Sequence, residues 1–230
     1  MDIRDLRTLV FDVMGTVVDE DTTVHDEVHQ LFVAHGLAPA RLTEFTSRWS
    51  DLLGAAMSAV QDGGPEWRTG DELRADALRR TVTEFGWGDE LPADAVELLA
   101  GVGHRFAPYA DSPAALEALG RSHALVALTN ASPPQLVDFS VAGGLRWHLA
   151  LSADAERGFK PSEKLYRLPA ELLGCSPSEL LFVAAHPWDL RGAAAIGYRT
   201  ALVRRPGVDD DGTDFDLVVA DLAELADELG

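Results

Sequence analysis

Apolar positions divide the chain into stretches with two different periodicities. Residues 9–11 form a continuous apolar run, which predicts a short, fully buried strand. From about residue 24 to residue 99, apolar side chains instead recur at the three- and four-residue spacing of helices. This second stretch predicts four helices and no strand, with the helices over residues 24–36, 42–60, 69–85 and 93–101.

Beyond residue 110 strands and helices alternate. Strands are predicted over residues 123–128, 148–152, 180–183, 199–203 and 217–219. Helices are predicted over residues 113–119, 134–142, 190–196 and 221–229, together with one after Lys160 that Pro169 should kink or delay. Parallel strands need crossover connections, so this order predicts an α/β fold whose parallel sheet carries helices on both faces.

The two patterns together predict two domains. A Rossmann-like core is expected from residues 1–18 and 103–230, and a helical cap from the inserted residues 19–102. The connections near residues 17–23 and 101–111 are expected to be hinges between them.

Composition narrows the class of protein. The chain has 230 residues and a formal net charge of −19, which opposes binding to nucleic acid or to anionic membranes. Cys175 is the only cysteine, which excludes an internal disulfide and a multi-cysteine metal site. There is no basic-then-apolar leader and no apolar run near the roughly 20 residues that span a bilayer. A cytoplasmic protein is expected.

Polar side chains follow several of the predicted strands. Asp12 follows the first strand, Thr129 and Asn130 end the second, Lys160 follows the third after a short loop, and residues 184–189 follow the fourth. In an open parallel sheet, ligands bind beyond the carboxyl ends of the strands. These features are therefore expected to converge on one site, which favours an enzyme.

The segment from Asp12 to Thr16 carries the first chemical signal. A carboxylate at the edge of a buried strand costs stability unless something binds it, Gly15 permits a sharp turn, and the Thr16 hydroxyl can hold a carboxylate oxygen. An ordinary Asx turn is the alternative interpretation. The spacing Asp-x-x-Gly-Thr after an apolar strand resembles the first motif of the haloacid dehalogenase superfamily, and this resemblance implies that Asp12 is a nucleophile.

Two further segments match the superfamily. The strand ending at Thr129 resembles its second motif, which implies that Thr129 and Asn130 bind a substrate oxyanion or carboxylate. Lys160 resembles the third-motif lysine, which keeps the nucleophile ionised. Tyr166 matches a tyrosine that lines the site of L-2-haloacid dehalogenases. The alternatives are a helix N-cap for Thr129, a surface position for Lys160 and core packing for Tyr166.

The pair Trp188 and Asp189 resembles the fourth motif of the type II L-2-haloacid dehalogenase branch. Phosphatases of the superfamily carry two acids there and use them to bind magnesium. Here the apolar pair Ala184 and Ala185 replaces the first acid, and only Asp189 remains. Phosphatases also place a proton-donating aspartate where this chain has Met14, which is predicted to lie beside the substrate. Displacement of a halide needs no such proton, and the dehalogenase branch works without a metal.

The cap adds two predicted pocket residues. Trp49 and Trp67 match tryptophan positions of the branch's cap, and with Trp188 they are expected to form an apolar pocket around a carbon–halogen bond. Packing of cap against core is the alternative for Trp49.

Three positions depart from the branch. Ser50 stands where the branch has the arginine that accepts the halide, and Ala184 stands where it has a serine. His186 stands where the branch has an asparagine, and it is expected either to orient the hydrolytic water or to be structural.

The sequence thus predicts a hydrolase that dehalogenates small L-2-haloacids through an ester on Asp12, with Thr16, Lys160, His186 and Asp189 as further catalytic residues. No cofactor is expected; the partner is a small organic acid, and an apolar cap helix suggests a homodimer. Two alternatives remain: a phosphatase that binds Mg²⁺ at Asp12 and Asp189, and a non-catalytic binder of small acids.

Overall fold

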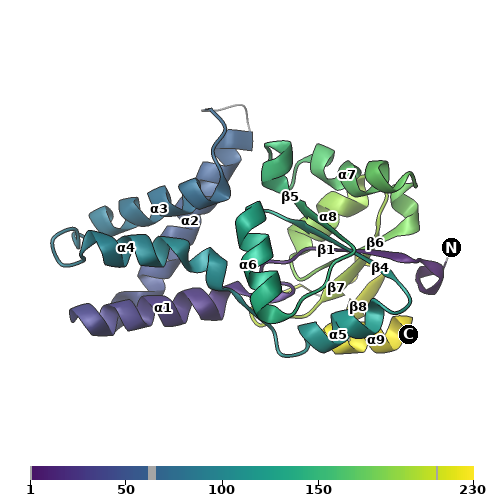
Figure 1. The fold of residues 1–230 in the computed structure, drawn as a ribbon, viewed down its shortest axis with the longest axis horizontal. Coiled ribbons are helices and arrows are strands. Elements are labelled where there is room, and N and C mark those ends of the chain that lie inside the picture. The colour runs from purple at the N-terminus through teal and green to yellow at the C-terminus, as the bar shows by residue number, and fades with distance from the viewer. Residues whose placement is uncertain (1, 62–65, 211) are drawn as a thin grey trace. The chain divides into compact units, whose positions relative to one another are not determined.

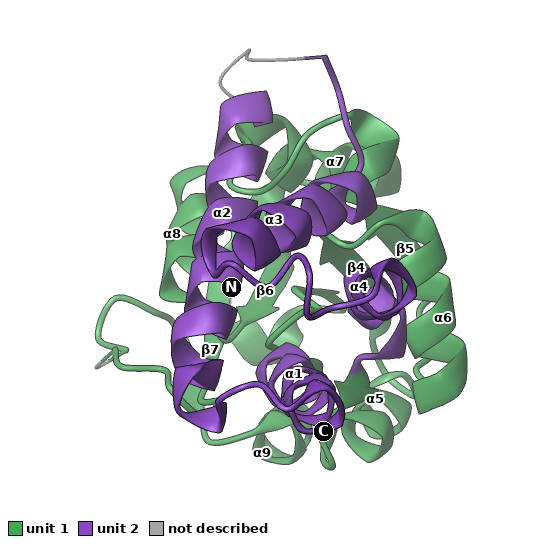
Figure 2. Ribbon diagram, turned by 90° about the vertical axis from the view of Figure 1, so that its left-hand side faces the viewer, with its two compact units in different colours: residues 1–19, 107–230 green, residues 20–106 purple. Residues whose placement is uncertain are grey.

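The computed structural model describes residues 2–61, 66–210 and 212–230. The chain forms two compact units, one from residues 1–19 and 107–230 and the other from residues 20–106 (Figure 2). We refer to them as unit 1 and unit 2. The expected cap spanned residues 19–102, so the structural division lies one residue later at the first boundary and four residues later at the second.

Unit 1 is built on a six-stranded sheet in which every neighbouring pair is parallel. The strand order is β5-β4-β1-β6-β7-β8. The predicted α/β class with a parallel sheet is therefore confirmed, and each predicted strand is present within one residue of its expected limits. The strands are β1 (Thr8–Phe11), β4 (Ala124–Thr129), β5 (Leu149–Ser152), β6 (Leu180–Ala184), β7 (Arg199–Val203) and β8 (Leu217–Val219).

Helices cover both faces of this sheet. Figure 1 shows α7 (Glu163–Leu173) and α8 (Pro187–Ala195) on one side and α5 (Ser112–Leu119) and α9 (Leu222–Leu229) on the other; α6 (Pro133–Gly143) follows β4. Alternate strand residues point to opposite faces. Val10 and Phe182 consequently pack with Leu190 in the core beneath α7 and α8. Helix α7 begins six residues before Pro169, so the prediction of a delayed start is wrong.

Two short strands were not predicted. β2 (Val18–Asp19) and β3 (Ala107–Pro108) pair antiparallel, with Val18 opposite Pro108. They lie within the segments expected to be hinges. A strand of two residues has no periodicity, so its sequence carries no signal of this pairing.

Unit 2 contains the four predicted helices, α1 (Glu20–His35), α2 (Leu42–Gln61), α3 (Gly70–Glu84) and α4 (Ala93–Ala100). Its described residues form no strand of their own. Local sequence sets several helix ends. Gly36, with φ of 66°, ends α1, and Thr69 caps α3 through a reciprocal capping box with Glu72. Phe32, Phe45 and Trp87 form an aromatic core.

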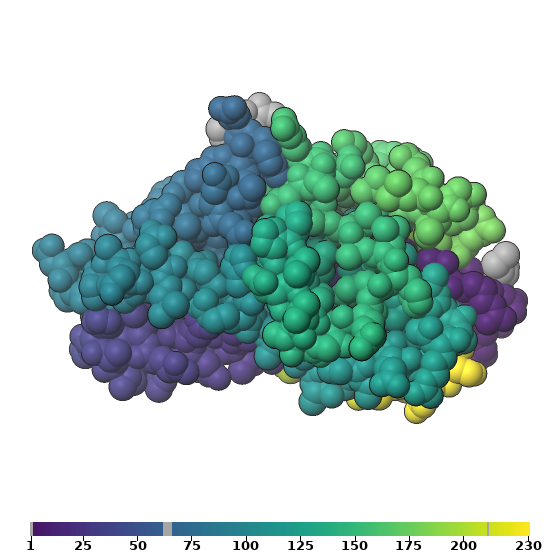
Figure 3. All heavy atoms as spheres, in the orientation of Figure 1, coloured from purple at the N-terminus to yellow at the C-terminus, as the bar shows by residue number. Residues whose placement is uncertain are grey.

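None of the helices in the described part of the chain is both long and apolar enough to cross a membrane. Helix α6 exposes Val137 and Val141 beside a groove of about 400 Å³ that Trp147 and Ala150 also line. Figure 3 shows the α6 segment at the surface of unit 1. This apolar face borders β5, an edge strand of the sheet.

Candidate active site

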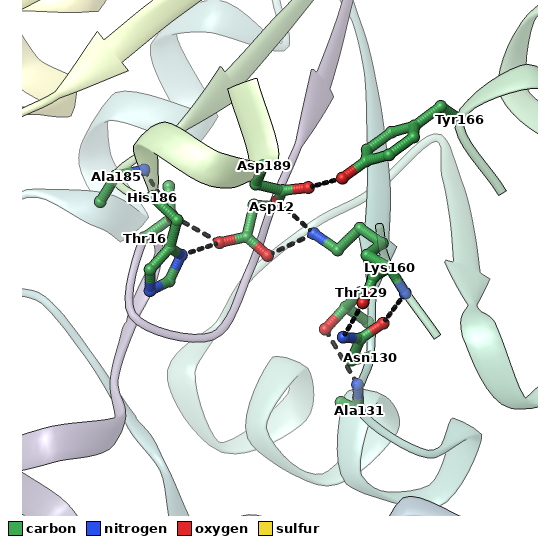
Figure 4. Close-up of polar contacts among 10 residues, drawn as sticks. All are labelled: Asp12, Thr16, Thr129, Asn130, Ala131, Lys160, Tyr166, Ala185, His186 and Asp189. Carbon is green, nitrogen blue, oxygen red and sulfur yellow. Dashed lines mark hydrogen bonds and ion pairs between the residues drawn. The ribbon is translucent and has the colours of Figure 1, made fainter. Parts of the chain in front are cut away.

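The side chains predicted to converge do so at one edge of the sheet in unit 1. Asp12 directly follows β1, Lys160 follows β5 after a 3₁₀ turn, and His186 and Asp189 follow β6. Because β1, β5 and β6 run parallel, their carboxyl ends lie at the same edge. Figure 4 shows the four side chains joined in a row, in which His186 contacts Asp12, Asp12 contacts Lys160, and Lys160 contacts Asp189.

Asp12 lies at the centre of the cluster and is only 5% exposed. Its Oδ1 accepts a hydrogen bond from Lys160 Nζ at 2.6 Å. Its Oδ2 accepts from the Thr16 hydroxyl at 2.7 Å and contacts His186 Nδ1 at 3.0 Å. Burial alone would raise the pKa of Asp12, but the Lys160 charge and the His186 contact hold it well below its usual value. Asp12 is therefore an ionised carboxylate.

The turn after β1 fixes the Asp12 side chain. Gly15 has φ of 71°, a left-handed conformation that glycine adopts without strain. Thr16 follows, and its Oγ1 accepts a hydrogen bond from the Ala185 amide at 2.8 Å while it donates to Asp12. The predicted contact between Thr16 and the carboxylate is thus present. The hydrogen bond from the Ala185 amide to Thr16 joins the loops after β1 and β6.

Lys160 bridges two carboxylates. Besides Asp12, its Nζ donates to Asp189 Oδ2 at 2.5 Å, and its side chain is 1% exposed. Burial would lower the pKa of Lys160, but the two carboxylates outweigh burial and raise it. The alternative of a surface lysine is excluded.

Asp189 is fully buried and has a second donor, the Tyr166 hydroxyl at 2.5 Å from Oδ1. Burial, with a contribution from the Asp12 charge, raises the pKa of Asp189. Burial and Asp189 also raise the pKa of the Tyr166 phenol, so Tyr166 stays a proton donor. Tyr166 is itself 1% exposed, and its ring packs in the sheet core, so it is placed to hold Asp189.

Asn130 and Thr129 contact the protein backbone. Asn130 Oδ1 accepts from the Lys160 amide at 2.7 Å, and its Nδ2 donates to the Lys160 carbonyl at 3.4 Å. Thr129 Oγ1 accepts from the Ala131 amide at 3.1 Å. Ser132 is the residue that caps α6, so the N-cap alternative for Thr129 is wrong. Asn130 therefore positions Lys160, and substrate binding by this pair stays a prediction.

Two other predicted residues lie in the same loops. Met14 is partly exposed and forms an isolated bridge with Val18. Trp188 is 47% exposed, and its ring centroid lies 5.7 Å from that of His186. Trp188 therefore presents an accessible apolar surface beside His186.

The predicted pocket residues Trp49 and Trp67 belong to unit 2. Trp49 is 2% exposed, and its indole N–H donates to the Arg74 carbonyl at 3.1 Å, which ties α2 to α3. Trp67 is partly buried. Their contact with a substrate stays a prediction.

Sequence reasoning missed two residues that support the site. Arg205 is 8% exposed and donates through Nε to the Thr16 carbonyl at 2.9 Å and through Nη1 to Asp111 at 2.8 Å. It follows β7, and only its position after a strand hints at a role. Gly192 lies in α8, where an added Cβ would come within 2.7 Å of the Tyr166 ring. A glycine inside a helix is a readable signal of such close packing.

The acid pair is a poor fit to a magnesium site. The Lys160 ammonium lies within 2.6 Å of Asp12 Oδ1 and 2.5 Å of Asp189 Oδ2, so a divalent cation bound between those oxygens would face its positive charge. In the described residues, no group of three or more His, Cys, Asp or Glu side chains is arranged to hold a metal ion.

Fold, strand-end acids and bridging lysine together define a class of hydrolase. The chain belongs to the haloacid dehalogenase-like hydrolases, whose family model matches residues 6–197. It is similar to the (S)-2-haloacid dehalogenase H-109 of Pseudomonas putida, with 30% identity over 99% of each chain. It is 29% identical to the (S)-2-haloacid dehalogenase of Pseudomonas sp. strain YL, covering 88% of this chain and 84% of that one.

A solved structure is also similar. The L-2-haloacid dehalogenase PA0810 superposes with a TM-score of 0.88 at 31% identity, covering 97% of this chain and 98% of the other. The predicted superfamily is therefore confirmed, and the similarity extends over both units.

Proposed function

We propose that the protein hydrolyses the carbon–halogen bond of small L-2-haloacids through an ester on Asp12. The observation that carries this proposal is that Asp12 is buried, ionised and paired with Lys160 at the carboxyl edge of the sheet. Similarity to proteins named (S)-2-haloacid dehalogenases supports the substrate class. Identity near 30% supports the type of reaction better than the individual substrate.

In the first step, a carboxylate oxygen of Asp12 attacks the α-carbon of the haloacid and the halide leaves with the bonding electrons. The departing halide needs no proton. This agrees with Met14, which stands two residues after Asp12 and has no proton to donate. The product of this step is an aspartyl ester with inverted configuration at the α-carbon.

In the second step, a water molecule attacks the ester carbonyl of Asp12. Asp189 and Lys160 orient this water, and the ester breaks to give the 2-hydroxy acid and a free Asp12. The overall reaction converts the haloacid and water into the hydroxy acid, a halide ion and one proton. Tyr166 supports this step indirectly because its hydroxyl holds Asp189 in place.

The substrate carboxylate is assigned to the loop after β4. Asn130 Nδ2 has two N–H groups and gives one to the Lys160 carbonyl, which leaves the second as a donor. Thr129 lies next to it and ends the strand. An anion held here would also feel the positive charge of Lys160.

The test is halide release from a series of short L-2-haloacids. Wild type is expected to release halide without added metal, and Asp12→Asn is expected to release none, because an amide is a poor nucleophile. Asp26→Asn, an exposed α1 residue, is the matched control and should retain wild-type turnover. A single turnover in ¹⁸O-water should place the label in Asp12. Failure of wild type to release halide from every substrate tried would remove this substrate class.

The two alternative functions, a phosphatase and a non-catalytic binder, predict different results when the same wild type and Asp12→Asn proteins are assayed. A phosphatase would release phosphate from a metabolite panel only with magnesium. A non-catalytic binder would bind small acids equally well as wild type and as Asp12→Asn, without turnover. The position of Lys160 between Asp12 and Asp189 counts against the phosphatase, because its positive charge opposes a magnesium ion bound by those two acids.

A further inference from the structure

The two oxygens of Asp12 have different surroundings. Oδ2 has two partners, the Thr16 hydroxyl at 2.7 Å and His186 Nδ1 at 3.0 Å. Among the residues that the structure describes, Oδ1 has one partner, Lys160 Nζ at 2.6 Å. Figure 4 shows these partners on opposite sides of the carboxylate. Since a carboxylate oxygen offers about two lone-pair directions, Oδ2 is fully engaged and Oδ1 retains one lone pair.

From this asymmetry we propose that Oδ1 is the attacking oxygen and that His186 is a catalytic donor to Oδ2 during ester hydrolysis. This inference rests on the proposed function. It adds which oxygen of Asp12 attacks the substrate and what His186 does during ester hydrolysis. Oδ2 becomes the carbonyl oxygen of the ester, and the Thr16 hydroxyl and His186 Nδ1–H form its oxyanion hole.

The His186 contact requires a proton on Nδ1. Ionised Asp12 offers only lone pairs at Oδ2, so the 3.0 Å contact is a hydrogen bond from Nδ1–H. Burial would lower the pKa of His186, but its hydrogen bond to Asp12 outweighs burial and raises the pKa. Neutral imidazole with its proton on Nδ1 donates in the same way, so the donor is present in either charge state.

The turn after β1 is shaped to admit the His186 ring. A Cβ added to Gly15 would lie 2.8 Å from His186 Cε1 and 3.0 Å from Nε2. The absence of a side chain at this position therefore lets the imidazole lie directly over the turn that presents Asp12. Thr16, the other donor to Oδ2, is fixed in the same turn by the Ala185 amide and the Arg205 guanidinium.

The same donors suit the charges of ester hydrolysis. When water adds to Cγ of Asp12, the π electrons of the carbonyl move to Oδ2, where two preformed donors stabilise the negative charge. When the intermediate collapses, the bond between Cγ and Oδ1 breaks and Oδ1 leaves within the hydroxy acid. Lys160 contacts that departing oxygen. One proton of the water passes to the departing oxygen, and the other is released to solvent.

The two half-reactions should therefore respond differently to loss of His186. The hydrogen bond to Oδ2 withdraws electron density from the carboxylate, so its removal should not slow ester formation. Ester hydrolysis loses one of two oxyanion donors, a change that typically lowers the rate by about 10²–10³-fold.

The experiment compares wild type with His186→Ala in rapid-quench halide release and intact-protein mass spectrometry. The variant is expected to release one halide per active site at no less than the wild-type rate. It should then turn over about 10²–10³-fold more slowly and accumulate the ester as a mass adduct. His186→Asn, which restores an N–H donor, is expected to recover most of the hydrolysis. His25→Ala, an exposed α1 histidine, is the control and should match wild type.

Two outcomes would overturn the proposal. Either His186→Ala slows the first halide release and the steady state by the same factor, or it turns over like wild type with no adduct. Should His186→Ala not fold, His186→Leu, which also removes the N–H donor but keeps more of the side-chain volume, provides the same comparison, and an Asn variant that hydrolyses the ester no faster than the Leu variant also refutes the assignment. Failure of wild type to release any halide would instead refute the proposed function, and this inference with it.

Discussion

Replacing Lys160 by methionine tests the electrostatic arrangement on which the site depends. The substitution keeps most of the side-chain volume and removes the ammonium that lies within 2.6 Å of Asp12 and 2.5 Å of Asp189. Two buried carboxylates are then left without their shared cation, while Tyr166 and Thr16 still donate to one oxygen of each.

The size of the effect follows from burial. Removing one partner of a buried ion pair typically costs about 3–5 kcal/mol, because the remaining charge is buried without compensation. Lys160 is 1% exposed on its side chain, so this full range applies and solvent screening does not reduce it. Lys164 is the second residue of α7, is 68% exposed and pairs with Glu156. It provides the matched control, for which Lys164→Met should cost at most about 1 kcal/mol.

The pH dependence has a definite sign. In wild type the pKa of Asp12 is lowered by Lys160, so its contribution to stability is present above the unfolded pKa of about 3.9 and is lost only as the pH falls below it. In Lys160→Met, burial and mutual repulsion raise the folded pKa of the carboxylate pair. The stability deficit of the variant should therefore be largest near pH 8 and should shrink as the pH falls toward 5.

Urea unfolding at pH 5 and pH 8, followed by circular dichroism, measures both effects. A double variant, Lys160→Met with Asp189→Asn, should recover part of the loss because it removes one of the two uncompensated charges. The reasoning is refuted if Lys160→Met costs no more than Lys164→Met, or if acidification widens the deficit.

Two further predictions concern packing and the nucleophile. Gly192→Ala should destabilise the protein by about 1–3 kcal/mol in the same denaturation assay, because its Cβ would lie 2.7 Å from the Tyr166 ring. A Cβ added to Gly54 in α2 would meet no atom of the described residues within 4 Å, so Gly54→Ala should be neutral or slightly stabilising. Lys160 holds the pKa of Asp12 low, so Asp12 should stay ionised from pH 8 to pH 5. The rate of the first halide release in rapid-quench measurements should therefore not change over this range. A fall in that rate with a midpoint near pH 5 would contradict the prediction.

Strand-end reasoning located the main acids and the cation of the site. The apolar runs at β1, β4 and β6 are continuous enough to read as buried strands, and in a parallel sheet their carboxyl ends must meet. Asp12 and Asp189 could therefore be placed together without coordinates, and Lys160 joined them because it follows another predicted strand of the same sheet, β5. The four helices of unit 2 were equally readable because each has at least two turns of apolar spacing.

The hydrogen bonds that hold the site residues in place could not be predicted from the ends of strands. The Asn130 side chain accepts a hydrogen bond from the Lys160 amide, and the Tyr166 hydroxyl donates one to Asp189. Each choice of partner depends on distances between segments far apart in the chain, and the residue types alone permit several partners. Arg205, which reaches back to the Thr16 carbonyl, was missed for the same reason.

The antiparallel pair of β2 and β3 has an architectural consequence. Asp19 is paired with Ala107, so residues 20–106 leave the core and return to it across one strand spacing, about 4.8 Å. A two-residue hairpin turn could bridge that gap without altering the path of either strand. A shorter or longer segment could therefore replace residues 20–106 without changing the order or direction of the strands in unit 1.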